Sequence, residues 1–197
     1  MARKSAAVRR EEILAATVEE IEATGLRALR VSDVAARLGL SASLVIYHFE
    51  TKEALVAEAF DFAGRQDIDR ARELAAGQVS ALQRLRDVVG WYLPSGSSRS
   101  WKIWIDAWSA GLFDAGLRAT FAALDREWKS ILVHLMDEAI AAGECTEPEG
   151  GTASGATRVL AFLDGLAIQV MVNSETVDTE ALSTWVDDFL TRELGWG

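Results

Sequence analysis

The spacing of apolar residues is the feature that most constrains the fold of this chain. One set recurs at intervals of three and four, which places its members on one face of a long helix. This set is Leu117, Phe121, Leu124, Trp128, Ile131 and Leu135. The 197 residues include only two prolines, and no run of alternating apolar and polar residues ends in a hairpin turn. The pattern predicts an all-α protein.

Glycine, serine and proline separate the helical segments and set their expected limits. We expect nine helices, at about residues 6–24, 32–38, 42–48, 51–75, 77–92, 101–112, 115–142, 153–173 and 178–194. The first three are short to medium in length and the later ones are longer. The sequence therefore predicts a small N-terminal domain over residues 1–50 and a larger helical domain over residues 51–197.

The charge of the chain differs between these two domains. The net charge is −10, yet residues 1–50 contain seven basic and seven acidic residues, so residues 51–197 carry the whole negative charge. This asymmetry indicates an N-terminal domain adapted to a polyanion. A single cysteine, the lack of a long uncharged apolar run and the lack of an apolar leader predict a cytoplasmic protein without a disulfide.

The two helices expected at 32–38 and 42–48 are joined by only three residues, Gly39-Leu40-Ser41. That connection has the length of a helix-turn-helix. Gly39 can take a positive φ and end the first helix. Small and apolar side chains, including Val34, Ala35 and Val45, would set the crossing of the two helices.

The second of these helices is expected to present its N-terminal side chains to a DNA major groove. Ala42, Ser43 and Leu44 are small or apolar and allow close approach to base edges. Serine or threonine at a helix start caps the helix and leaves backbone N–H groups that favour phosphate. Three residues fit this description, and a lysine follows the last of them: Ser32, Ser41, Thr51 and Lys52. Spacing alone leaves open an ordinary pair of short helices.

The stretch VSDVAARLGLSASLVIYHFETKEALVAEAF closely resembles the DNA-binding signature of TetR-family transcriptional regulators. The resemblance spans roughly residues 8–60 and implies an all-α homodimer that binds operator DNA. It implies that Tyr47 and His48 face the DNA backbone and that Lys52 contacts phosphate. It also implies that Phe49 packs inside the small domain.

Two positions depart from that family pattern. Ile46 stands where tyrosine is frequent, and Ala42 where lysine is frequent. We expect a basic tail formed by Arg3, Lys4, Arg9 and Arg10 either to compensate by contacting DNA or to serve only as a solubilising tail.

The larger domain is rich in tryptophan. The segments WKIWIDAWSAGLF and FLDGLAIQVMV resemble the betaine/choline-type repressor branch of the same family. Aromatic walls suit an apolar or cationic effector, although tryptophans also pack in cores and dimer interfaces. Asp164 and Gln169, which interrupt apolar turns, could orient a ligand or bond across helices. The predicted effector-binding residues are Trp101, Trp104, Trp108, Phe121, Trp128, Phe162 and Gln169.

The last two helices are expected to form a homodimer interface, as two helices from each subunit make a four-helix bundle. Their apolar stripes supply the predicted contacts: Val159, Leu163, Leu182, Trp185, Val186 and Phe189.

The residues that chemistry would need are sparse. The chain has two histidines, His48 and His134, and one cysteine, and it lacks the motifs of metal-, nucleotide- and dinucleotide-binding enzymes. We therefore expect no catalytic residue, metal or cofactor. The favoured function is a repressor released from its operator by a small effector. The alternatives are a DNA-binding regulator without such a ligand and a helical carrier or enzyme that has lost DNA binding.

Overall fold

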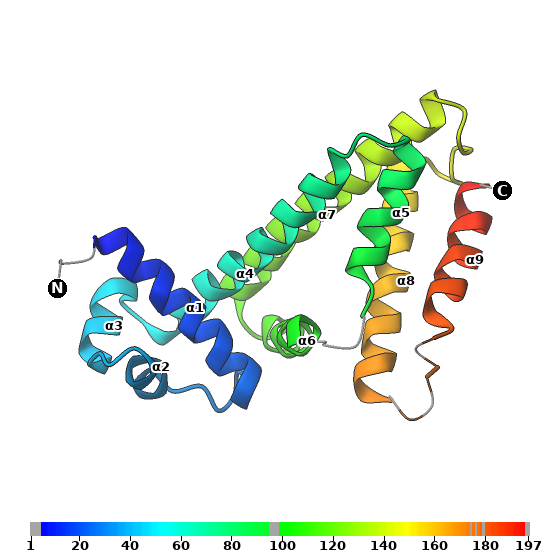
Figure 1. Ribbon diagram of the computed structural model, residues 1–197. Helices are drawn as coiled ribbons and strands as arrows, with labels where there is room; N and C mark the ends of the chain where they lie inside the picture. Colours follow the sequence, from blue (N-terminus) through cyan, green and yellow to red (C-terminus); the bar gives the residue numbers. More distant parts are fainter. Residues whose placement is uncertain (1–4, 95–98, 174, 176, 179, 196–197) are drawn as a thin grey trace. The chain divides into compact units, whose positions relative to one another are not determined.

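A computed structural model describes residues 5–94, 99–173, 175, 177–178 and 180–195. Every regular element in these ranges is an α-helix, as predicted (Figure 1). The helices are α1 Ala6–Thr24, α2 Val31–Arg37, α3 Ala42–Phe49, α4 Lys52–Ala75, α5 Ala81–Tyr92, α6 Arg99–Gly111, α7 Ala115–Ala141, α8 Thr152–Val172 and α9 Leu182–Leu194.

Local sequence signals account for most helix ends. The Ser41 hydroxyl accepts a hydrogen bond from the Leu44 N–H at 3.2 Å, so Ser41 caps α3 as predicted. Gly25 and Gly39 take φ values of 81° and 64°, which a side chain would disfavour, and each follows the end of a helix.

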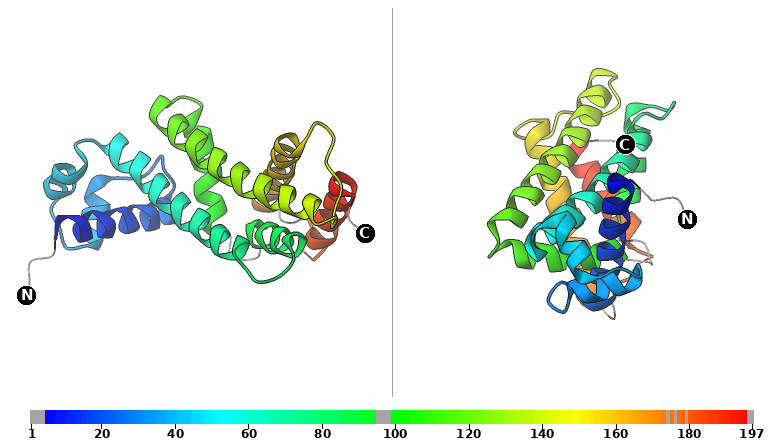
Figure 2. Two further views of the ribbon diagram at one scale, coloured as in Figure 1. Left: turned by 90° about the horizontal axis from the view of Figure 1, so that it is seen from above. Right: turned by 90° about the vertical axis from the view of Figure 1, so that its left-hand side faces the viewer.

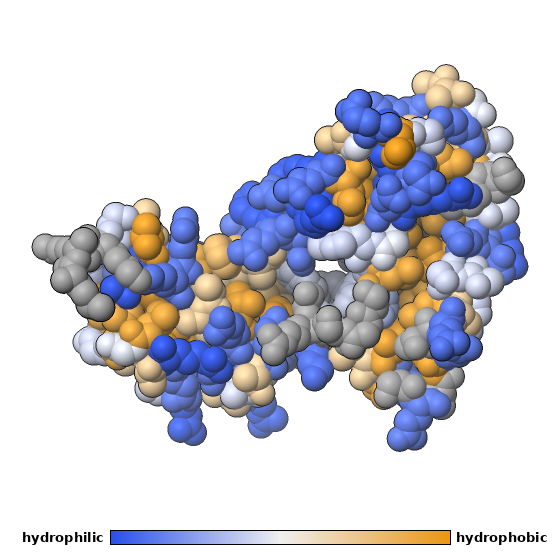
Figure 3. Space-filling view, in the orientation of Figure 1, coloured by the Kyte–Doolittle hydropathy of each residue, from blue (hydrophilic) through white to orange (hydrophobic). Residues whose placement is uncertain are grey.

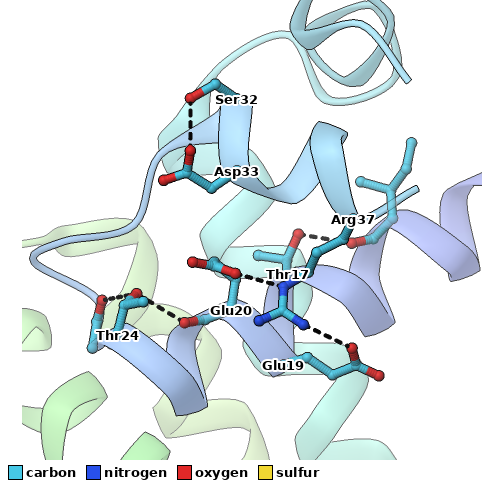
Figure 4. Close-up of polar contacts among 9 residues, drawn as sticks. Thr17, Glu19, Glu20, Thr24, Ser32, Asp33 and Arg37 are labelled. Atoms are coloured by element: carbon cyan, nitrogen blue, oxygen red, sulfur yellow. Dashed lines mark hydrogen bonds and ion pairs between the residues drawn. The ribbon is translucent and has the colours of Figure 1, made fainter. Parts of the chain in front are cut away.

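One predicted cap is wrong. Helix α2 begins at Val31, one residue earlier than expected, and its N-cap is Arg30. The amides of Asp33 and Val34 bond to the Arg30 carbonyl, while the Ser32 hydroxyl donates to the Asp33 carboxylate at 3.1 Å (Figure 4). Ser32 is therefore an exposed residue inside the first turn rather than the cap.

Helix α5, by contrast, begins later than expected. The Ser80 hydroxyl accepts from the Gln83 N–H at 3.2 Å, which fixes the start at Ala81 instead of residue 77.

The chain forms two compact units. Unit 1 consists of Met1–Gln66 and Lys102–Leu124, and unit 2 consists of Asp67–Trp101 and Asp125–Gly197. The division at residue 50 into a DNA-binding and an effector-binding domain stays a prediction, because compactness assigns no function. The structure adds that α6 from Lys102 onward and the first part of α7 pack with the N-terminal helices.

Unit 1 has a continuous apolar core. It is made of buried side chains from α1 to α4 together with α6 and α7, among them Ile13, Val34, Val45, Leu55, Phe60, Ile103 and Leu117. Helices α1, α2 and α3 lie together in both views of Figure 2. An ion pair also joins α1 to α2, since Arg37 Nε lies 2.5 Å from a carboxylate oxygen of the largely buried Glu20 (Figure 4).

Unit 2 is built on α5, α8, α9 and the later parts of α4 and α7. Its core includes Ile68, Leu85, Leu132, Leu135, Met136, Val159, Leu163, Val186 and Leu190. Helix α8 is, among the described helices, the one whose length and composition would allow it to cross a membrane. Seven of its 21 residues are buried by the packing of the protein itself.

Candidate DNA-binding surface and effector site

The N-terminal face of α3 is exposed. Ala42, Ser43 and Leu44 all reach the surface, whereas Val45 and Phe49 on the opposite side are buried. The hydroxyls of Ser41 and Ser43 lie 3.0 Å apart at this end of the helix. The arrangement presents small polar and apolar groups outward, as the predicted contact with DNA bases requires.

The aromatic cluster at the end of α3 divides between surface and core. Tyr47 is 79 % exposed, His48 is half-buried and Phe49 is only 2 % exposed. The rings of Tyr47 and His48 meet edge to face, with centroids 5.5 Å apart. The inward position predicted for Phe49 is confirmed. The outward orientation of Tyr47 agrees with the predicted backbone contact, which stays a prediction.

The start of α4 offers a second polar group. The Thr51 hydroxyl accepts from the Ala54 N–H at 3.0 Å and caps the helix, and the half-buried Lys52 follows at its first position. A helix N-terminus beside a lysine favours a phosphate. Thr51 and Lys52 follow Tyr47 and His48 by four residues in the sequence, across the turn that joins α3 to α4.

A strained turn joins α3 to α4. Glu50 has φ 65° and ψ −51°, and it is the one described residue other than glycine with a positive φ. The Thr51 N–H donates to the Phe49 carbonyl at 2.7 Å, which closes a γ-turn around Glu50. Such backbone conformations are uncommon for a residue with a side chain and are often found at functional sites.

The predicted basic tail is only partly described. Arg3 and Lys4 lie outside the described residues, but Arg9 and Arg10 belong to α1. Arg9 pairs with Glu12 on the same helix at 3.0 Å, whereas Arg10 bonds to other helices. The expectation of one tail containing all four residues is therefore wrong, because the helix begins at Ala6.

Unit 2 contains a tyrosine bonded to a carboxylate. The Tyr92 hydroxyl on α5 donates to a carboxylate oxygen of Asp164 on α8 at 2.8 Å. Burial raises the pKa of Asp164 to about 6, while the hydrogen bond from Tyr92 opposes that rise. Burial, followed by the neighbouring Asp164 charge, raises the pKa of Tyr92 well above its ordinary value. At pH 7 the pair is therefore a phenol beside a largely ionised carboxylate.

Three tryptophans lie beside Tyr92, two in direct contact with its ring and one in contact through Trp128. The Tyr92 ring meets Trp101 and Trp128 edge to face, with centroids 5.1 Å and 4.8 Å away. Trp91 stacks on Trp128 at 6.0 Å and 18°. We call these four rings and Asp164 the aromatic–carboxylate cluster. Electron-rich ring faces next to a carboxylate attract an organic cation, and a cluster of this composition could hold a quaternary ammonium group.

Three other predicted effector residues belong to unit 1. Trp104 and Phe121 pack against Phe60 at centroid distances of 6.2 Å and 5.8 Å and against each other at 6.2 Å. This triangle of rings lies in the unit 1 core, and the half-buried Trp108 belongs to the same unit. Helical spacing places the three tryptophans of α6 on one face, but of these three only Trp101 belongs to unit 2.

Phe162 and Gln169 do not join the cluster. The Phe162 ring instead stacks on Phe189 of α9, with centroids 4.1 Å apart and planes 12° apart. Gln169 is exposed, and its side-chain oxygen accepts from the Asn173 amide at 2.8 Å. The suggested bond of Gln169 across helices finds no support, because its side chain is exposed and its described hydrogen bond is with Asn173 at the end of its own helix.

Most of the predicted dimer contacts need the same correction. Four of the six side chains are buried inside unit 2, where α8 packs against α9: Val159, Leu163, Leu182 and Val186. They serve the core of the protomer itself. Trp185 remains 41 % exposed, and Phe189 is half-buried.

Sequence reasoning misses three members of the cluster. Helical spacing singles out neither Trp91 nor Tyr92, and it leaves the role of Asp164 open. Their signal was an adjacent Trp-Tyr pair before Pro94 and an acidic residue within an apolar helix. Pairing them required the approach of α5 to α8, which spacing does not encode.

The titratable side chains give little support to a metal site or a catalytic site. Within the described part of the chain, no three His, Cys, Asp or Glu residues gather as metal ligands. His134 lies 3.4 Å from Glu138, one turn along an exposed face of α7.

Comparison with known proteins gives a family match for the N-terminal segment and another for the C-terminal segment. The family model described as "Bacterial regulatory proteins, tetR family" matches residues 13–59, and that described as "BetI-type transcriptional repressor, C-terminal" matches residues 81–195. The chain is 25 % identical to the HTH-type transcriptional regulator BetI of Escherichia coli K12 over 191 residues, covering 95 % of this chain and 94 % of that protein.

Two solved structures share the fold. A putative transcriptional regulator from Saccharomonospora viridis, in complex with choline, has a TM-score of 0.85 at 23 % identity, with 95 % of this chain and 98 % of that one covered. A TetR transcription regulator from Haloarcula marismortui has the same TM-score at 18 % identity, with 95 % and 99 % covered. This chain belongs to the TetR family of DNA-binding transcriptional regulators, with a BetI-type repressor C-terminal domain, and not to a family of enzymes.

Proposed function

We propose that this protein is a cytoplasmic repressor that binds a palindromic operator as a homodimer and leaves it when an organic cation binds to unit 2. The DNA-binding part rests on the exposed face of α3 and on the polar start of α4. In a symmetric dimer, two α3 helices about 34–36 Å apart would enter successive turns of the major groove.

The aromatic–carboxylate cluster is the observation that carries the effector assignment. Asp164 supplies a negative charge in a half-buried setting, Tyr92 bonds to it, and Trp101 and Trp128 pack edge to face against the Tyr92 ring. The choline complex of the related fold supports a quaternary ammonium effector. A ligand of that class gains both cation–π and ion-pair attraction here.

The dimer is proposed to form through the outer faces of α8 and α9. These faces carry small or apolar residues that the protomer leaves exposed or half-buried: Ala161, Gly165, Ile168, Val172, Trp185 and Phe189. Apolar surface is visible along α8 and beside α9 in the space-filling view (Figure 3). Two helices from each subunit would bury it in a four-helix bundle.

Effector binding would act by shifting a population of conformations. An effector that binds more tightly to dimers in which the two α3 helices are badly spaced for DNA lowers operator affinity. By reciprocity, the operator lowers effector affinity by the same coupling free energy.

The experiment begins with selection of DNA sites by the purified protein, followed by titration of the selected site with choline. A palindromic site, released by choline, is the expected result. The control is 3,3-dimethylbutan-1-ol, which has the shape of choline without its charge and should be at least about tenfold weaker. A palindrome that no ammonium compound releases would favour a regulator without a small-molecule ligand. Absence of any selected site would contradict the repressor assignment.

A further inference from the structure

Arg10 on α1 reaches both helices that flank the strained turn. Its guanidinium donates to the backbone carbonyl of His48 near the end of α3 and to the carboxylate of Glu58 on α4. The guanidinium carbon also lies 4.2 Å from the centroid of the Phe49 ring. One side chain therefore contacts the residues before the turn, the helix after it, and the aromatic that anchors α3 in the core.

Each contact has a separate physical role. The last carbonyls of a helix lack partners within that helix, and a cationic donor there is favourable. Stacking on Phe49 fixes the plane of the guanidinium, and the ion pair with Glu58 fixes its position relative to α4. Between these anchors, Glu50 holds a positive φ that its backbone alone would disfavour.

We propose that Arg10 is a positioning residue for operator binding, which clamps the α3–α4 turn and so sets the orientation of α3 and of Tyr47 and His48. The inference rests on the proposed binding of DNA by unit 1, but it assigns Arg10 no contact with DNA.

The neighbouring Arg9 provides a matched control. It carries the same charge one residue earlier on the same helix, and its described ion pair is with Glu12 of α1 at 3.0 Å. A general electrostatic contribution to DNA affinity would be similar for both arginines, whereas a clamp involves only Arg10.

The test compares Arg10→Gln, Arg9→Gln and Glu58→Gln by titrating the selected operator at several salt concentrations, at a temperature where every variant is folded. Arg10→Gln should lower affinity at least about tenfold without changing the slope of log K against log salt, since no phosphate contact is lost. Arg9→Gln should change affinity less than about threefold. Glu58→Gln should also weaken binding, although it removes a negative charge.

A direct role of Arg10 on phosphate predicts opposite results. The salt slope would become shallower by about one, and Glu58→Gln would strengthen binding. Either result would overturn the inference.

A second measurement does not depend on DNA. Hydrogen exchange of the Thr51 amide, which closes the γ-turn, should be faster in Arg10→Gln than in wild type and unchanged in Arg9→Gln. Equal exchange in Arg10→Gln and wild type would contradict the clamp even if the wild type bound DNA. If Arg10→Gln does not fold, Arg10→Lys, which keeps the charge but loses the planar fork, should show the same acceleration at Thr51.

Discussion

The two compact units present their candidate sites in opposite ways. In unit 1 the predicted DNA contacts lie between Ser32 and Lys52, and most are exposed. In unit 2 the aromatic–carboxylate cluster collects side chains from four helices between Trp91 and Asp164, and most are buried or half-buried. A DNA-reading surface can thus be encoded in one local motif, whereas an effector site depends on tertiary packing.

Asp164 is also held differently from the carboxylates that join helices. Arginines pair with those carboxylates in both units, as in Arg37–Glu20 of unit 1 and Arg84–Glu138 of unit 2. The described hydrogen bond of Asp164 comes instead from the neutral hydroxyl of Tyr92. A carboxylate bonded to a neutral donor keeps its negative charge available for an incoming cation, which an arginine partner would have neutralised.

The largest expected effect tests whether α6 from Lys102 onward and the first part of α7 belong to unit 1. Phe60 is 1 % exposed and packs on Trp104 and Phe121, so Phe60→Ala should lower the free energy of unfolding by about 3–5 kcal/mol in urea denaturation. Amide protection in α6 should fall together with that in α1 to α3.

The control for that variant is Phe113→Ala in the same unit. Phe113 is 90 % exposed, so its removal should change stability by less than about 0.5 kcal/mol. Equal effects of the two variants would contradict the described packing.

The Asp164 carboxyl group should make the free energy of unfolding depend on pH. The pKa of Asp164 is about 6 when folded, against its ordinary 3.8, so between these values the folded state binds more protons than the unfolded state. The free energy of unfolding should therefore fall as pH rises from about 4 to 6 and stay level above, a loss of about 2–3 kcal/mol. Asp164→Asn should remove this component and be the more stable form at pH 7.

The measurement is the difference in unfolding free energy between Asp164→Asn and wild type from pH 4 to pH 8. For Asp164→Asn this difference should grow as pH rises from about 4 to 6, because only the wild type loses stability. Asp137→Asn, at an exposed position of α7, serves as the control, and its difference from wild type should not grow with pH. A flat difference for Asp164→Asn would contradict the buried setting of this carboxyl group.

The exposed motif of unit 1 should govern DNA binding without affecting unit 2. Replacing Tyr47 and Lys52 together by alanine should lower operator affinity at least about tenfold, or 1.4 kcal/mol, and reduce the salt slope by about one. Lys129→Ala in unit 2, which removes a lysine paired with Asp125 at 2.8 Å, is the charge-matched control. Unchanged affinity in the double variant would exclude these residues as DNA contacts.

The smallest effect concerns the strained turn. Glu50→Gly should relieve the positive φ and raise stability by up to about 1 kcal/mol, after the entropic cost of glycine is included. Glu11→Gly, at an exposed position inside α1, should instead lower stability by about 1 kcal/mol. If thermal unfolding showed that both variants change stability in the same direction, this result would contradict strain at Glu50.

The sequence predicted the helix-turn-helix well because its signals are local. The turn at Gly39 and the Ser41 cap follow from positions a few residues apart, and the division between Tyr47 and Phe49 is what the resemblance to the TetR family implies. It could not predict that Arg10 crosses to α3 and α4, because that contact joins residues 38 and 48 positions apart.

In unit 2 the same limit had larger consequences. Helical spacing identified Val159 and Leu163 as apolar positions on α8, but it could not say whether α9 or a second subunit covers them. Spacing likewise placed Trp101 and Trp104 on one face of α6, whereas the compact units divide between these two residues. The effector cluster depends on the approach of α5 to α8, which the Tyr92–Asp164 hydrogen bond shows and which helical spacing cannot predict.

The central claim, that unit 1 binds DNA and that a cation held beside Asp164 ends this binding, is tested most directly by one titration. The selected operator is bound to wild type, Asp164→Asn or Asp137→Asn, and the choline concentration that releases half of the protein is measured. We expect similar release for wild type and Asp137→Asn, and at least about tenfold more choline for Asp164→Asn, with operator affinity unchanged before choline is added. Equal release of all three proteins would contradict the account.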